Sequence, residues 1–259
     1  MNEFYDPELY DARVQPPPGD VEFYVELARE AHTSGRPVLE LASGTGRIAI
    51  PIAREGIDIV GLDASPAMLG RAREKSEGLS NVRWVEGDMR AFELPERFGL
   101  AFIALRSFQH LLTVDDQRSC LRCIHQHLAD GGRLAINIFN PNILRIGQAL
   151  RDGQGTLQRR GLSFTHPRSG RTTERWESVA YDHARQEFDV TFIDEELGEG
   201  GVVASRVYRG LHLRYLFRFE MEHLLTQAGF EVEALYGDFA RSAFTDTSPE
   251  MVWLARRPA

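Results

Sequence analysis

Two glycines that follow a short apolar run occupy positions where they could bind a charged ligand. Gly44 and Gly46 come after the apolar residues 38–41 and precede residues 47–54, whose apolar side chains recur with helical spacing. Glycine lacks the Cβ atom that would keep a ligand away from the backbone, and a helix N-terminus offers N–H groups and a positive dipole end. This strand–turn–helix pattern predicts a site for a nucleotide-like cofactor.

Three acidic residues at strand ends discriminate between possible cofactors. Glu40 lies just before the glycines, Asp63 ends a second apolar run, and Asp88 ends a third. A carboxylate at the position of Asp63 can bind both ribose hydroxyls, and the glycine spacing alone is a loose dinucleotide fingerprint. However, Glu40 would repel a pyrophosphate and attract an ammonium group. A positively charged, phosphate-free ligand is favoured over NAD(P), although Asp63 and Asp88 could instead cap the helices that follow them.

These strand ends meet only if the strands form one parallel sheet, and the sequence predicts such a sheet. Asp20 and Ser65 are expected to cap helices, and the helix after Thr113 is expected to stop at the glycines 131–132. The alternation of strands and helices predicts a doubly wound α/β sheet. Its first five strands are expected at residues 38–41, 57–62, 82–86, 100–105 and 133–139.

The pattern changes after residue 142. Residues 162–217 alternate polar and apolar side chains, which predicts three or four antiparallel strands in an insertion without a core of its own. Further expected elements are an irregular segment at 1–20, a helix at 143–150, a glycine-rich stretch at 152–155, a helix at 218–228, and strands at 230–236 and 250–256.

Composition limits the classes of function. The chain has 259 residues and a formal net charge of −8, so no global basic field would attract nucleic acid. Cys120 and Cys123 fall within a helical pattern and are expected to be buried thiols rather than a redox pair or half of a zinc site. No apolar run is long enough to cross a membrane, and the acidic, aromatic N-terminus is unlike a signal peptide, so a cytoplasmic location is expected.

Four motifs in this order resemble those of class I S-adenosylmethionine-dependent methyltransferases, in particular the small-molecule branch of sugar and glycine N-methyltransferases. They lie at residues 38–46, 60–69, 85–89 and 108–111. The resemblance implies a Rossmann-like seven-stranded sheet whose last strand is antiparallel, with an antiparallel β insertion after strand five. We expect a single domain over residues 1–259, with an N-terminal lid segment and helix at 1–35 and an insertion at 143–217 that covers the acceptor site.

The resemblance also implies a role for individual residues toward S-adenosylmethionine. Glu40 is expected near the methionine ammonium, Asp63 at the ribose hydroxyls and Asp88 at the adenine amino group. Met68 is expected against the adenine, although a methionine on a helix could equally belong to the core. The other expected cofactor-binding residues are Ala42, Ser43, Gly44, Thr45, Gly46, Ala64, Gly87, Met89, Leu105, Arg106 and His110, with Leu105 and Arg106 bordering the sulfonium.

Methyl transfer from a sulfonium requires alignment and, for a protonated nucleophile, a base. His110 is a candidate base, or a residue that positions the cofactor, and Tyr10 resembles the lid tyrosines of sugar N-methyltransferases, or packs the tail onto the domain. Arg214 and Tyr215 are candidate acceptor-binding residues. The expected function is methyl transfer to N or O of a small metabolite by a monomer or homodimer, without metal, nucleic acid or membrane.

Two other functions stay open at this point. The chain could be a methyltransferase-fold protein that binds the cofactor without turnover. Less in keeping with Glu40 and Asp88, it could be an NAD(P)-dependent oxidoreductase.

Overall fold

A computed structural model describes residues 6–151 and 157–259 of the chain. The chain divides into two compact units. The first, here called the Rossmann unit, comprises Pro16–Asn140 and Leu216–Ala259, and the second, the insertion unit, comprises Met1–Gln15 and Pro141–Tyr215. The expected division into one domain with a lid and an insertion stays a prediction.

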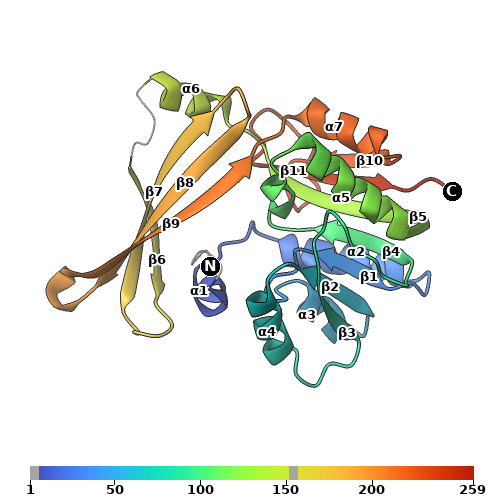
Figure 1. Ribbon diagram of the computed structural model, residues 1–259, viewed down its shortest axis with the longest axis horizontal. Helices are drawn as coiled ribbons and strands as arrows, with labels where there is room; N and C mark the ends of the chain where they lie inside the picture. Colours follow the sequence, from blue (N-terminus) through green and yellow to red (C-terminus); the bar gives the residue numbers. More distant parts are fainter. Residues whose placement is uncertain (1–5, 152–156) are drawn as a thin grey trace. The chain divides into compact units, whose positions relative to one another are not determined.

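The Rossmann unit is built on a seven-stranded sheet with the strand order β10-β11-β5-β4-β1-β2-β3 (Figure 1). The first five strands pair in parallel, whereas β11 pairs antiparallel with both β5 and β10, which confirms the predicted sheet with its antiparallel last strand. The strands are β1 (Val38–Leu41), β2 (Ile59–Asp63), β3 (Val82–Glu86), β4 (Phe98–Ile103), β5 (Leu128–Phe139), β10 (Glu231–Tyr236) and β11 (Glu250–Arg256).

Helices cover both faces of this sheet. One hydrophobic core joins the sheet to α2 and α3, and the other joins it to α5 and α7. Ser65 acts as the predicted cap and accepts a hydrogen bond from Met68 N–H, and the structure shows that Thr113 caps α5 by accepting from Asp116 N–H. Both cysteines are buried free thiols, as expected. The helices are α2 (Asp20–His32), α3 (Ala49–Arg54), α4 (Pro66–Lys75), the 3₁₀ turn η2 (Ser107–His110), α5 (Val114–His127) and α7 (Arg218–Gln227).

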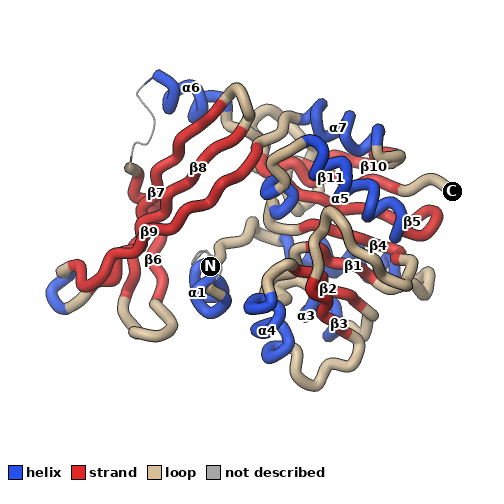
Figure 2. The backbone as a smooth tube through the Cα atoms, viewed as in Figure 1, coloured by secondary structure: helices blue, strands red, loops and turns tan. Residues whose placement is uncertain are grey.

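The insertion unit is a four-stranded antiparallel sheet with the order β6-β7-β8-β9. Figure 2 draws its strands in red. The sheet follows β5 and confirms the predicted antiparallel insertion. Its strands are β6 (Gln158–Thr165), β7 (Thr172–Asp182), β8 (Glu187–Leu197) and β9 (Val203–Arg214). Its helices are α1 (Pro7–Arg13), α6 (Ile143–Arg151) and the 3₁₀ turn η3 (Glu199–Gly201).

Two expectations about the N-terminal residues are wrong. Residues 7–13, expected to be irregular, form α1, because the Asp6 side chain accepts from Leu9 N–H and a proline occupies the first turn. Asp20 is not the cap of α2. Gly19 is, and the Asp20 carboxylate binds Arg47 instead.

Strand boundaries near the glycines also differ. Strand β4 ends at Ile103, before two left-handed residues, and β5 begins at Leu128, so the glycines at 131–132 lie inside a strand and do not stop the helix. The glycine-rich stretch 152–155 lies outside the described residues.

Candidate cofactor site

The loop between β1 and α3 uses its two glycines in different ways. Gly44 and Gly46 both have positive φ, at 54° and 78°. An ideal Cβ on Gly44 would meet no atom within 4 Å, so space is open beside this residue. A Cβ on Gly46 would come within 2.6 Å of the Trp84 ring and 2.9 Å of Ile50, so packing inside the protein already requires glycine there. Only Gly44 leaves room for a ligand next to its backbone.

Ala42 stands in the same loop in the left-handed conformation, with φ of 54°. A residue with a Cβ is strained in this region, which glycine adopts freely. The backbone of this loop is therefore strained at Ala42.

Glu40 lies beneath the loop and is buried, with 3% of its surface exposed. It accepts a hydrogen bond of 2.9 Å from Ala49 N–H at the start of α3. Burial raises the pKa of this carboxyl to about 8, against the opposing effect of the nearby Arg47 cation. A buried acid of this kind gains most from a cationic partner such as an ammonium group.

Asp63 joins the glycine loop to the end of β2. One carboxylate oxygen accepts from Gly44 N–H and the other from Ser65 N–H, both at 2.8 Å. Burial raises the pKa of Asp63 despite these two bonds. Each oxygen keeps a further lone pair, which is what two ribose hydroxyls require.

Asp88 lies at the surface after β3. It binds Arg90 through the side chain and accepts from the Arg90 N–H at 2.8 Å, and these contacts lower its pKa. Arg90 also binds Asp116. Met89 packs against the core, and Met68 is buried.

The segment after β4 turns sharply at Leu105 and Arg106, which have φ of 49° and 65°. Arg106 forms an ion pair with buried Glu250 on β11, and its backbone N–H donates to Asn137 Oδ1 at 3.3 Å. His110 ends the 3₁₀ turn that follows. Desolvation by the surrounding protein atoms lowers the pKa of the His110 imidazole to about 4, so His110 is neutral at pH 7 and a weak base.

The remaining candidates belong to the insertion unit. Tyr10 lies in α1, Arg214 ends β9, and Tyr215 is buried with its hydroxyl 2.8 Å from His183 Nδ1. The structure thus brings the loop residues, Glu40 and Asp63 together within one unit, and it places Tyr10, Arg214 and Tyr215 in the other.

The sequence interpretation missed Arg47. Its guanidinium makes two hydrogen bonds to Asp20, at 3.0 and 2.6 Å, and its charge acts on Glu40. The available signal was an arginine immediately after Gly46. Arg47 can meet a ligand carboxylate where Glu40 meets an ammonium, and together these two charges suit an amino-acid moiety.

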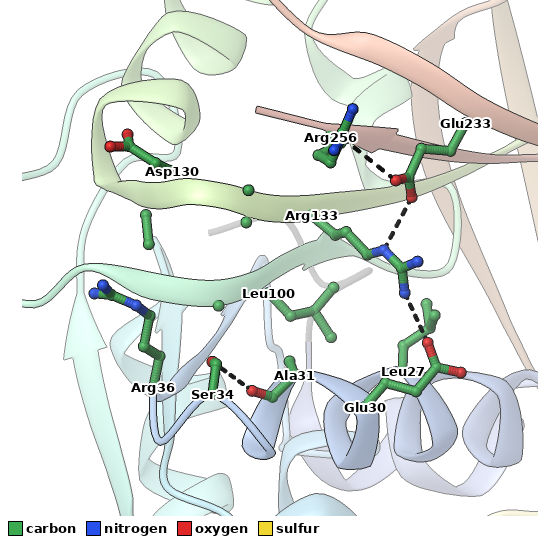
Figure 3. A pocket seen from close by; sticks show the side chains of 14 residues that line it. Leu27, Glu30, Ala31, Ser34, Arg36, Leu100, Asp130, Arg133, Glu233 and Arg256 are labelled. Carbon is green, nitrogen blue, oxygen red and sulfur yellow. Dashed lines mark hydrogen bonds and ion pairs between the residues drawn. The ribbon is translucent and has the colours of Figure 1, made fainter. Parts of the chain in front are cut away.

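A cavity of about 370 Å³ lies at the other edge of the sheet (Figure 3). It is lined by residues at the amino ends of the parallel strands, among them Arg36, Leu100 and Arg133, and Arg133 binds Glu30 and Glu233 across it. Ligands of open α/β sheets bind at the carboxyl ends of the strands, so this cavity is separate from the glycine loop.

Comparisons with known proteins agree with this geometry. The family described as "Methyltransferase domain" matches residues 38–132. A glycine/sarcosine N-methyltransferase of Parasynechococcus marenigrum (strain WH8102) is 27% identical over 227 residues, covering 85% of this chain and 71% of that protein. A dTDP-3-amino-3,4,6-trideoxy-alpha-D-glucopyranose N,N-dimethyltransferase of Streptomyces venezuelae is 27% identical over 213 residues, covering 82% of each.

A solved structure matches the whole fold. The CcbJ methyltransferase from Streptomyces caelestis has a TM-score of 0.82 and 28% sequence identity, and the match covers 100% of this chain and 99% of that one. The fold and the glycine loop therefore define a Rossmann-like methyltransferase. The chain is an S-adenosylmethionine-dependent methyltransferase, as its motifs predict, and nothing in the comparisons supports an oxidoreductase.

The residues present fit S-adenosylmethionine. There is open space beside Gly44 for the cofactor to approach the backbone. The Glu40 carboxyl and the nearby Arg47 cation suit the ammonium and carboxylate of its methionine moiety, and the Asp63 carboxylate suits its ribose hydroxyls. In the described part of the chain, no three His, Cys, Asp or Glu side chains gather as metal ligands, and no helix is long and apolar enough to cross a bilayer.

Proposed function

We propose that this methyltransferase methylates an amino nitrogen of a small metabolite. The observation that carries the proposal is the glycine loop with Glu40, Arg47 and Asp63 around it, in a chain that matches a methyltransferase over its full length. S-adenosylmethionine supplies a methyl group already activated by its sulfonium.

The chain's own residues bind and orient the cofactor in this proposal. Arg47, fixed by Asp20, takes the methionine carboxylate, and Glu40 takes the ammonium. Asp63 takes the ribose hydroxyls, and Asp88 and Met89 meet the adenine. We also propose that Gly87, Ala64 and the other residues expected from the motifs bind the cofactor.

A nitrogen acceptor is favoured over a hydroxyl by the chemistry of His110. A hydroxyl needs a base strong enough to remove its proton, and the pKa of His110 is lowered to about 4. An amine is already nucleophilic once neutral. The two curated relatives described above are N-methyltransferases by name, acting on glycine or sarcosine and on an amino sugar.

We further propose that acceptor-binding side chains come from the insertion unit, with Tyr10, Arg214 and Tyr215 as candidates. Support comes from the resemblance to small-molecule methyltransferases. A monomer or homodimer, a cytoplasmic location and the absence of nucleic-acid partners stay predictions.

Two measurements test the function. Isothermal calorimetry should show binding of S-adenosylmethionine and S-adenosylhomocysteine, but not NADH, and Asp63→Ala should weaken binding of both adenosyl ligands. Transfer of labelled methyl groups to a library of matched amines and alcohols should then label the amines. Binding without transfer to any acceptor would leave a cofactor-binding protein, and labelling of alcohols alone would overturn the nitrogen assignment.

A further inference from the structure

The turn at Leu105 and Arg106 is held by residues from distant parts of the sequence. Two consecutive non-glycine residues in the left-handed region are strained, and such a conformation persists only where its surroundings enforce it. The surroundings here are β5, β11 and α2, all within the Rossmann unit.

A closed ring of hydrogen bonds links these elements to the turn. Asn137 on β5 accepts from the Arg106 backbone N–H at 3.3 Å and donates to Glu250 Oε2 at 3.1 Å. Glu250 on β11 accepts from Arg106 Nε at 3.2 Å and also binds its Nη2. The Tyr24 hydroxyl on α2 lies 3.4 Å from Asn137 Oδ1. The turn is thus fixed through both the backbone and the side chain of Arg106.

Because most of this ring is buried, the negative charge of Glu250 is important for compensating the positive charge of Arg106. Glu250 is 2% exposed and Asn137 and Tyr24 are fully buried, whereas the Arg106 side chain is 39% exposed. The charged partner that Glu250 contacts is Arg106. Removing the negative charge would leave one guanidinium uncompensated, at the turn that we place beside the cofactor's sulfonium.

We propose that Glu250 is a positioning residue for methyl transfer, which holds the Leu105–Arg106 turn in place and cancels the Arg106 charge beside the sulfonium. The inference depends on the proposed placement of Arg106 at the cofactor. S-adenosylmethionine carries a positive sulfonium and S-adenosylhomocysteine a neutral thioether, so an uncompensated cation weakens binding of the first more than of the second.

The test compares the dissociation constants of these two ligands by calorimetry. Glu250→Gln keeps the size of the side chain and removes its charge. We expect the affinity for S-adenosylmethionine to fall roughly fivefold relative to that for S-adenosylhomocysteine, as for one uncompensated charge in partly solvated surroundings. The double variant Arg106→Met/Glu250→Gln, which removes both charges, should restore the wild-type ratio and fold even where the single variant is unstable.

A matched control is Glu233→Gln, which weakens ion pairs with Arg133 and Arg256 at the other end of the same strands. It should leave the ratio unchanged. If Glu250→Gln melts at a lower temperature and loses affinity for both ligands by the same factor, the role of Glu250 is merely structural and the inference is overturned. If the wild type binds both ligands and Glu250→Gln leaves the ratio of the two dissociation constants unchanged, the inference is overturned as well. A wild type that binds neither ligand would instead contradict the proposed function itself.

Discussion

Substituting alanine for each of the two glycines of the cofactor loop should affect different properties: stability at Gly46 and cofactor affinity at Gly44. Gly44→Ala and Gly46→Ala both place a Cβ on a left-handed residue, which costs about 1 kcal/mol in each. Gly46→Ala also drives the Cβ to 2.6 Å from Trp84 and 2.9 Å from Ile50, and overpacking of this kind costs about 1–3 kcal/mol more. Gly44→Ala meets no protein atom within 4 Å.

Gly46→Ala should therefore lose about 2–4 kcal/mol of unfolding free energy, and Gly44→Ala about 1 kcal/mol. For cofactor affinity the order of the two variants is reversed, because the Cβ of Gly44→Ala enters the open space beside the loop. The affinity of Gly44→Ala for the cofactor should fall roughly tenfold or more. Urea unfolding with a fixed m-value measures the first quantity, and calorimetry with S-adenosylmethionine the second. The reasoning is refuted if Gly44→Ala is the less stable variant, or if it binds the cofactor as wild type does.

Four more predictions concern this loop and its contacts. Glu40, whose pKa is raised to about 8, is mostly protonated at pH 7 and should release up to about one proton when a ligand ammonium lowers that pKa. Calorimetric titrations in buffers of different ionisation enthalpy measure this proton release. The Glu40→Gln variant should abolish it. Stability of the free protein should correspondingly fall as pH rises from about 4.5 to 8, by up to about 1.4 kcal/mol per unit, since the folded state keeps the proton that the unfolded chain gives up. Ala42→Gly relieves a left-handed alanine and should raise the unfolding free energy by up to about 1 kcal/mol; a loss in urea unfolding would contradict the strain. Asp20→Asn breaks the paired contact with Arg47 and should lower both stability, by about 3 kcal/mol, and cofactor affinity, whereas loss of stability alone would remove Arg47 from the site.

The sequence predicts the features that depend on local signals. Ser65 caps its helix as its residue type suggests, and the strand–glycine–helix unit forms where the spacing places it. Glu40 lies in β1 and Asp63 ends β2, whereas Asp88 lies two residues beyond the end of β3. Each of these signals acts over a few residues, which is why the sequence displays them.

Features set by distant partners were missed. Asp20 has the residue type of a cap, but Arg47, 27 positions along the chain, binds its carboxylate instead. The apolar pattern of β4 continues to Leu105, yet the strand ends at Ile103 because the turn that follows is held by Asn137, and by Glu250 at a sequence separation of 144. No local pattern around Leu105 records partners so far away.

The strand order has a consequence for synthesis on the ribosome. In the finished sheet β5 is an interior strand, flanked by β4 and β11. During translation β4 emerges before β5, whereas β11 begins only at Glu250, after the whole insertion unit has been made. For that interval the apolar strand β5 is an unprotected sheet edge, of the kind that pairs with other chains. The nascent chain is therefore most prone to aggregation while its insertion is being synthesised, and premature termination before residue 250 leaves that edge permanently open.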